Sequence, residues 1–199
     1  MRKLIILSFA MLCAVSASAQ ITAREWVEAL NYTLGDKYAL FMRVDAYGEE
    51  IKGYFMVEED SYYIQLGVME VYSNGKLRYE INNERKEVTE DRVDLSSVDL
   101  LTNPTRAFEF VADEFTATID DNIHNGVILK LVPKEDIGIT AIYVSVVNDG
   151  EGNITPLAIK YDYEGDEVAI ALIMADAEGS VLPRWNKSAY SGYDIVSFL

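Results

Sequence analysis

The chain has 199 residues and a formal net charge of −16, from 33 acidic against 17 basic residues. That length suits one domain with a hydrophobic core of its own. The acidic side chains are dispersed along the chain, as on a solvated surface. A chain with so few basic residues lacks the positive footprint that nucleic acid and anionic lipid headgroups require, so we expect neither as a partner.

The first residues have the parts of a secretory signal. A positive pair, Arg2 and Lys3, precedes an apolar run at residues 4–15, and small residues suited to cleavage end the segment. We therefore expect residues 1–19 to be removed on export and residues 20–199 to form a single mature domain. The apolar run is too short to cross a bilayer as a helix.

The mature chain contains few groups that could carry out catalysis. Cys13 lies inside the signal, so disulfides, thiol catalysis and cysteine metal sites are not expected. A lipidated Cys13 is the weaker alternative, since no small residue stands just ahead of it. His124 is the one histidine and lies in a turn-like sequence, which leaves zinc sites and histidine triads without partners. We expect no catalytic residues, no metal and no cofactor, and hence no enzyme.

One helix is predicted at the start of the mature chain. Thr22 and Glu25 form a capping box, and Gly35 has the position of a C-terminal glycine. Between them the apolar residues recur at helical spacing, which predicts an amphipathic helix that covers another element.

Most of the remaining chain reads as strands joined by short turns, which favours antiparallel pairing. Two groups of strands are predicted, before and after an insert at residues 94–111 that has helical patterns around Asn103 and Pro104. The number of strands suits a large curved sheet or a barrel. The expected strands are 37–47, 51–57, 61–66, 69–73, 76–82, 85–90, 115–120, 126–133, 139–147, 154–163, 167–175 and 193–198.

The sequence Asn74-Gly75 is the strongest hairpin signal, and we expect a type I′ turn with both residues at positive φ. Beyond it Leu77, Tyr79 and Ile81 alternate with polar residues, as on a strand with one buried face. Other strands, such as 140–147, are apolar on both faces and need cover from the helix and the insert.

The order of these parts resembles the LolA family of periplasmic lipoprotein carriers. A front helix is followed by a meander with the hairpin Ser73-Asn74-Gly75-Lys76, by an insert in which Asn103-Pro104 precedes Phe108, and by an ending with the segment Leu182-Pro183-Arg184-Trp185. The resemblance implies a mainly β fold, a strongly curved, incomplete antiparallel barrel covered by a helical lid. It also implies an apolar cavity for the acyl chains of lipoproteins.

Further implications of the resemblance concern location and partners. Family members are periplasmic, receive lipoproteins from an inner-membrane ABC transporter and pass them to an outer-membrane acceptor; we expect a monomer. One departure is clear, because the Arg-Pro pair whose arginine latches the lid in the best-known carriers is replaced here by Glu58-Glu59-Asp60.

The predicted acyl-chain site combines strand residues that alternate along the meander with apolar residues of the insert. The strand residues are Leu40, Met42, Val44, Tyr62, Ile64, Leu66, Leu77, Tyr79 and Ile81, and the lid residues are Leu100, Leu101, Phe108 and Phe110. We expect Leu77, Tyr79 and Ile81 to face inward beside Tyr62. Two alternatives remain: a binding module for another lipid or apolar ligand, and an interaction or sensor domain with a filled core.

Overall fold

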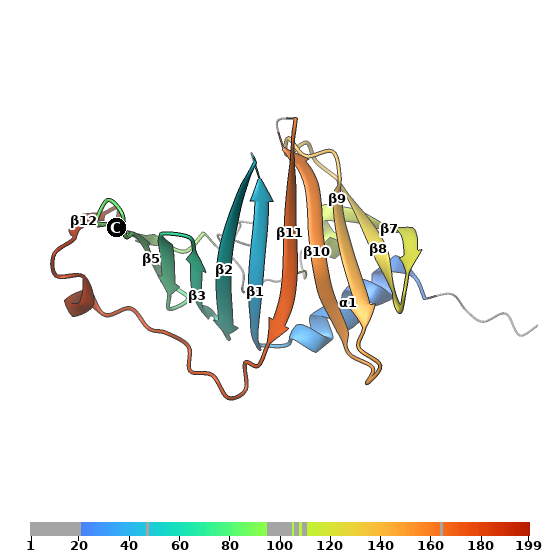
Figure 1. Cartoon of the computed structure of the whole chain (residues 1–199), viewed down its shortest axis with the longest axis horizontal. Coiled ribbons are helices and arrows are strands. Elements are labelled where there is room, and N and C mark those ends of the chain that lie inside the picture. The colour runs from blue at the N-terminus through green and yellow to red at the C-terminus, as the bar shows by residue number, and fades with distance from the viewer. Residues whose placement is uncertain (1–20, 47, 95–104, 106–107, 109–110, 164) are drawn as a thin grey trace, which may run out of the picture.

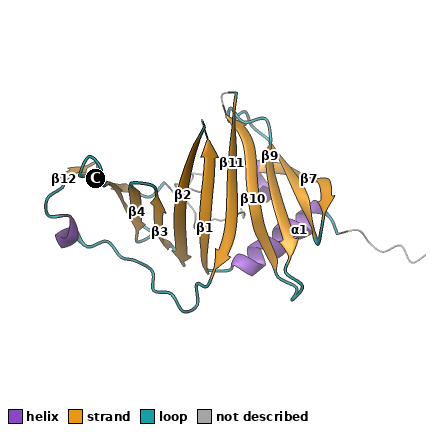
Figure 2. Ribbon diagram, viewed as in Figure 1, coloured by secondary structure: helices purple, strands orange, loops and turns teal. Residues whose placement is uncertain are grey.

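The computed structural model describes residues 21–46, 48–94, 105, 108, 111–163 and 165–199. Their strands form one 12-stranded sheet in the order β12-β6-β5-β4-β3-β2-β1-β11-β10-β9-β8-β7 (Figure 1). The edge strands β7 and β12 do not pair with each other, so the sheet is open. The predicted mainly β fold with an unclosed, curved sheet and a helix beside it is confirmed (Figure 2).

The strand bounds follow the predicted ones closely, because short turns separate runs with a two-residue alternation. The strands are β1 Lys37–Ala46, β2 Glu49–Glu58, β3 Ser61–Leu66, β4 Met69–Ser73, β5 Leu77–Asn82, β6 Glu87–Arg92, β7 Phe115–Ile123, β8 Gly126–Pro133, β9 Ile142–Asn148, β10 Ile154–Tyr163, β11 Asp166–Ala175 and β12 Asp194–Ser197. The helices are α1 Ala23–Leu34, the short α2 Val111–Glu114 and the 3₁₀ turn η2 Lys187–Tyr190. No helix within the described part of the chain is long and apolar enough to cross a membrane.

Helix α1 has the predicted capping box. The side chain of Thr22 accepts a hydrogen bond from the backbone N–H of Glu25, and Glu25 Oε2 accepts one from the backbone N–H of Thr22 at 2.6 Å. Gly35 ends the helix at φ 59°, and its N–H donates to the carbonyl oxygen of Asn31. Both predicted helix ends are confirmed.

Replacing Thr22 with alanine removes the hydroxyl that accepts from Glu25. We expect the free energy of unfolding to fall by about 1 kcal/mol, the usual cost of losing an N-cap side chain. Urea denaturation checks this value, and a Thr22→Ser variant, which keeps a hydroxyl, should lie within about 0.5 kcal/mol of the natural protein. Equal losses in both variants would contradict the capping role.

The hairpin at Asn74 forms, but its turn is not of type I′. Gly75 has φ 83°, whereas Asn74 is not among the residues with positive φ. Instead Asn74 Oδ1 accepts from the backbone N–H groups of Lys76 and Leu77 at 3.0 and 2.9 Å. An Asn side chain that bonds to the backbone ahead of it offers an alternative turn, and this competition explains the wrong prediction.

Strand order departs from chain order at the centre of the sheet. β1 pairs with β11, so Leu40 lies opposite Met174 and Val44 opposite Ile170. This pairing joins the meander β1–β6 to the meander β7–β11. The C-terminal strand β12 pairs with β6 in parallel, the one departure from antiparallel pairing among the described strands.

The register defines two faces, since residues directly opposite each other on paired strands project to the same side. We call the face with Leu40, Phe55 and Ile64 the inner face; α1 lies against it at β10 and β7. The face with Met56 and Tyr63 is the outer face. The segment between β11 and β12 crosses the outer face, and Figure 1 shows it leaving β11 and running past β1 to β4 toward β12 at the far edge.

Candidate functional site: the apolar inner face

The inner face is one continuous apolar surface over most of the sheet. Five of the predicted strand residues belong to the buried cluster on this face, and Leu66 packs against it; the five are Leu40, Met42, Val44, Tyr62 and Ile64. The cluster continues across β11, β10, β9 and β8 through Leu172, Ile159, Val144 and Leu129. Burial of this much apolar surface is the main contribution to the stability of the sheet.

The cover of this surface consists, among the described residues, of α1 and the segment with Phe108 and Val111. The same buried cluster contains Val27, Leu30 and Leu34 of α1 together with Phe108 and Val111. Phe108, a predicted lid residue, is 6% exposed. Leu100, Leu101 and Phe110 lie outside the described residues.

Two side chains of α1 link the cover to its surroundings. Asn31 Oδ1 accepts from the backbone N–H of Phe108 at 3.2 Å, and Thr33 Oγ1 accepts from the backbone N–H of Ile154 at 2.9 Å. The cover is thus held by side-chain contacts and by hydrogen bonds to two side chains, and none of these links is a strand pair.

The predicted placement of Leu77, Tyr79 and Ile81 beside Tyr62 is wrong. Tyr79 lies opposite Tyr72, and Tyr72 lies opposite Tyr63, so this row is on the outer face. Tyr62 lies opposite Ser73, which lies opposite Arg78. Alternation shows which residues of β5 share a face, but one residue of register decides which face that is.

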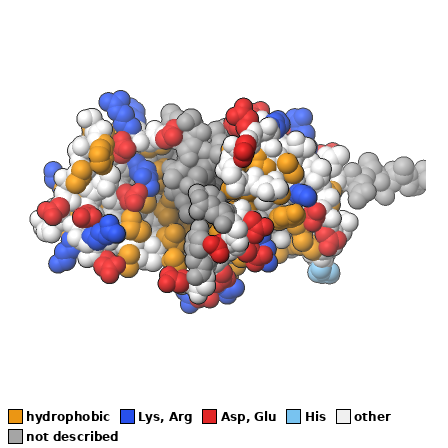
Figure 3. All heavy atoms as spheres, turned by 90° about the horizontal axis from the view of Figure 1, so that it is seen from above, with side chains coloured by type: hydrophobic (Ala, Val, Ile, Leu, Met, Phe, Trp, Pro, Cys, Tyr) orange, Lys and Arg blue, Asp and Glu red, His pale blue; other side chains and the backbone are white. Residues whose placement is uncertain are grey.

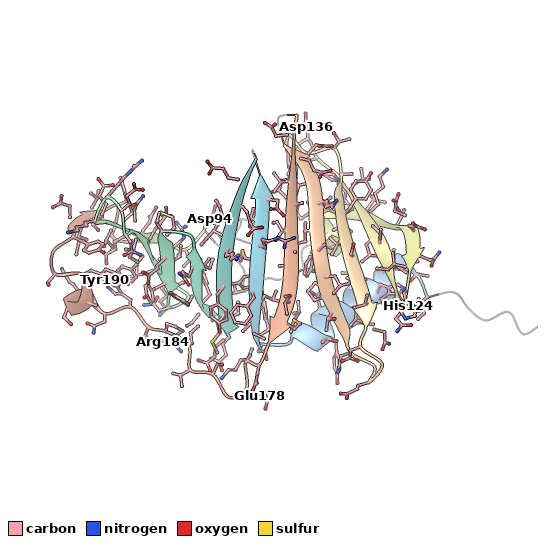
Figure 4. The ribbon with its side chains drawn as sticks, in the orientation of Figure 1. Asp94, His124, Asp136, Glu178, Arg184 and Tyr190 are labelled. Carbon is pink, nitrogen blue, oxygen red and sulfur yellow. The ribbon has the colours of Figure 1, made fainter. Side chains whose placement is uncertain are left out.

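The C-terminal segment places aromatic and aliphatic side chains against the outer face of the sheet. Trp185 stacks on Tyr79 and Tyr190, with ring centroids 4.6 and 5.0 Å apart and interplanar angles of 11° and 15°. Leu182 is buried with Met56 and Ala39. Figure 4 shows Tyr190 and Arg184 on this segment, beside the β2–β5 half of the sheet. We call residues 176–193 the strap.

The carboxylate of Glu70 joins the strap to the outer face. Glu70 Oε2 accepts hydrogen bonds from the hydroxyls of Tyr72 at 2.8 Å, Tyr190 at 3.0 Å and Tyr63 at 3.4 Å. Its Oε1 accepts from Asn83 Nδ2 at 2.6 Å. Burial alone would raise the pKa of Glu70, but these four hydrogen bonds together outweigh it and hold the pKa below its ordinary value.

This lowered pKa predicts a loss of strap docking in acid. A carboxyl whose pKa is lower in the folded state stabilises that state above its unfolded pKa, about 4.5, and loses this contribution as the pH falls through the folded value. We expect Glu70→Gln to have a lower free energy of unfolding than the natural protein at about pH 7, and the difference to shrink as the pH falls below about 4.5. A difference that stays constant with pH would contradict this role.

The inner face becomes polar at β5. Arg78, Glu80 and Asn82 lie on it, opposite Ser73, Val71 and Met69 of β4. Arg78 Nη2 lies 2.7 Å from Glu80 Oε2, and the two side chains are 22% and 36% exposed. Arg78 was not predicted as a site residue, because it alternates with Leu77 and Tyr79, which look like the buried side of the strand.

Glu58 is one of the three residues that stand where the best-known carriers have an Arg-Pro pair, and it has a structural role here. Glu58 Oε2 lies 3.0 Å from Arg184 Nη2, and Glu58 Oε1 lies 3.1 Å from Lys37 Nζ. Lys37 also donates to the carbonyl oxygen of Ser180. Glu58 therefore helps to hold the strap at the outer face.

The polar side chains described next are exposed or form hydrogen bonds within their own turns. His124 is exposed in the turn between β7 and β8, at the opposite end of the sheet from Tyr190 (Figure 4). Asp149 accepts from the backbone N–H of Glu151 and from both the backbone and the side chain of Asn153. Within the described residues no three His, Cys, Asp or Glu side chains are grouped to hold a metal. Acidic and basic side chains are scattered over the face shown in Figure 3.

The comparisons with known proteins concern the fold. An uncharacterized conserved protein from Thermus thermophilus is 10% identical and has a TM-score of 0.56, over 88% of this chain and 98% of its own. The two proteins share a fold. No family model and no curated protein matches the sequence.

Two further solved structures are similar at lower scores. A LolA superfamily protein from Nitrosomonas europaea is 9% identical with a TM-score of 0.39, over 86% of this chain and 98% of its own. LprF from Mycobacterium bovis is 14% identical with a TM-score of 0.42, over 83% and 99%.

Proposed function

We propose that the protein is a non-catalytic periplasmic carrier that binds the acyl chains of lipoproteins on its inner face. The observation that carries this proposal is an apolar inner face on an open sheet, under a cover whose described links to the sheet include no strand pair. Because none of the described links between the cover and the sheet is a strand pair, the cover can move away without breaking one. The buried cluster then receives an apolar ligand between the sheet and the cover, where the ligand contacts Phe108.

The energetics of lipid transfer require such a site. Exposing an acyl chain to water costs about 0.8 kcal/mol per CH₂, so a soluble carrier has to shield the chain along its length. The side chains that would do so here are those of the inner face, such as Leu40 and Ile64, which are 1% and 3% exposed under the cover. By resemblance, an inner-membrane ABC transporter would supply the lipoprotein and an outer-membrane acceptor would take it.

Native mass spectrometry of the mature protein, purified without detergent from its own periplasm, tests the proposal. We expect a mature chain that begins at Gln20 and carries the added mass of an acylated protein or a lipid. The identity of the bound mass distinguishes a lipoprotein carrier from a module for another lipid. A ligand-free mass that does not change after incubation with a triacylated lipoprotein would favour the filled-core alternative.

The register supplies a matched pair of variants for the same test. Phe108 is buried against the inner face, whereas Leu77 lies on the outer face. We expect Phe108→Glu to lower acyl-chain affinity at least about tenfold, because burying a charge beside the ligand is unfavourable, and Leu77→Glu to leave it unchanged. Phe108→Ala tests the contact if the glutamate variant does not fold. Equal losses at both positions would contradict binding on the inner face.

A further inference from the structure

The inner face carries a buried row of polar groups at the edge of its apolar area. Tyr62, Ser73 and Arg78 lie directly opposite one another on β3, β4 and β5. Tyr62 is fully buried, and Ser73 is 5% exposed. The next row toward the apolar area holds Ile64 and Val71, both members of the buried cluster, and ends at Glu80 on β5. Apolar and cationic surfaces therefore meet within one residue spacing of a strand.

Arg78 is only partly neutralised in this row. A guanidinium has five N–H donors, and Glu80 accepts at Nη2, while the Tyr62 hydroxyl is a second hydrogen-bonding partner of Arg78. The Nε of Arg78 is buried, and no acceptor lies within reach of it in the described part of the chain. A buried donor of a charged group without an acceptor is costly, so this position requires an explanation.

An oxygen anion matches the charge and the donor geometry of the guanidinium. The guanidinium fork presents two parallel N–H groups, which match the oxygens of a carboxylate or a phosphate. An acyl chain attached to that anion would extend from Arg78 over Val71 and Ile64 toward Leu40, along the apolar rows of the inner face. A ligand with both parts satisfies the Nε donor and covers the apolar surface at the same time.

We propose that Arg78, supported by Tyr62 and Ser73, binds the anionic oxygen at the polar end of an acyl lipid whose chain lies on the inner face. This assignment rests on the proposed function, because it needs the chain-binding surface. It departs from the expectation drawn from the net charge, because a single guanidinium inside the fold can bind an anion without a basic surface. It adds a selectivity that an apolar surface alone does not give. Neutral and anionic lipids of the same chain length would be distinguished at Arg78.

The test compares three ligands with the same chain and different polar ends: dodecanoate, dodecyl phosphate and dodecanol. Affinities are measured by isothermal titration calorimetry at about pH 8, where the carboxylate is ionised. We expect the natural protein to bind at least one of the anions about tenfold more tightly than the alcohol, a difference typical of one charge-assisted contact. Which anion is preferred identifies the headgroup as carboxylate or phosphate.

Variants at Arg78 separate this contact from general effects. Arg78→Gln should lose the preference for the anion and keep the affinity for dodecanol. Arg78→Lys should keep part of the preference, because it retains the charge but not the fork. Lys76→Gln is the matched control, since it removes an exposed positive charge from the turn that leads into the same strand, and it should change nothing.

The outcomes distinguish the two proposals. A natural protein that binds all three ligands equally, or an Arg78→Gln variant that retains the anion preference, overturns the role of Arg78 and leaves acyl-chain binding in place. A natural protein that binds none of the three overturns the chain-binding surface, and the role of Arg78 with it.

Discussion

Gly126→Ala is expected to lower the free energy of unfolding by about 3 kcal/mol, the upper end of the usual cost of overpacking. A Cβ at this position would overlap the carbonyl oxygen of Val146 and lie 2.9 Å from the Cα of Val147. Both contacts are with backbone, which cannot rotate away as a side chain can. Val146 is fully buried, so any shift of its backbone disturbs the inner face. Urea denaturation of both proteins measures this change in the free energy of unfolding.

The control for this variant is Gly192→Ala. No atom lies within 4 Å of a Cβ built at Gly192, and its φ is not in the left-handed region. Such a change is expected to stay within about 0.5 kcal/mol of the natural protein. If both glycines tolerated alanine equally, the close approach of β8 to β9 at Gly126 would be wrong.

Trp185→Ala is expected to release the strap and β12 while leaving the inner face intact. The variant loses two stacked pairs and the contacts of a partly buried aromatic side chain. Truncation of a fully buried aromatic residue costs about 3 kcal/mol, and we expect a smaller loss here. Hydrogen exchange provides a local measurement. The backbone N–H of Asp194 donates to the carbonyl oxygen of Lys86 and that of Phe198 to the carbonyl oxygen of Glu90, so both amides report the pairing of β12 with β6.

Protection at these two amides should fall in Trp185→Ala and be largely retained in Trp185→Phe, which keeps a stacked ring. Amides of the central strands, such as those of β1, should keep their protection in both variants. Unchanged exchange at Asp194 and Phe198 would show that β12 is held without the strap.

The elements with local signals were predictable from the sequence. The capping residues of α1 and the alternation in β3 and β4 depend on neighbours a few residues away, and their bounds are confirmed. The pairing of β1 with β11 and the parallel pairing of β12 with β6 leave no local pattern, because each joins segments more than 100 residues apart. Local periodicity carries no information about such partners.

The candidate site was predictable only in part, for a related reason. Ile64 and Leu40 were assigned to one face correctly, since their strands are apolar mainly on the inner side. Tyr79 was placed on the wrong face because the strap, which covers the outer face of β5, comes from residues about 100 positions later in the chain. Both faces of β5 have buried contacts. The alternation of residues along β5 therefore could not show which side of the strand belongs to the inner face. No local pattern in the sequence pointed to Arg78, because its place beside Tyr62 depends on the registers of β3, β4 and β5.

The central pairing of β1 with β11 also determines how this chain can fold. Each meander contains contacts between neighbours and can begin to form early, but residues 37–46 must wait for residues 166–175 before the sheet is continuous. Closing so long a loop is slow, because its entropy is lost before the contacts are made. The middle of the native sheet is therefore expected to be among the last parts to assemble. Until it does, the strands on either side present unpaired edges that other chains can reach.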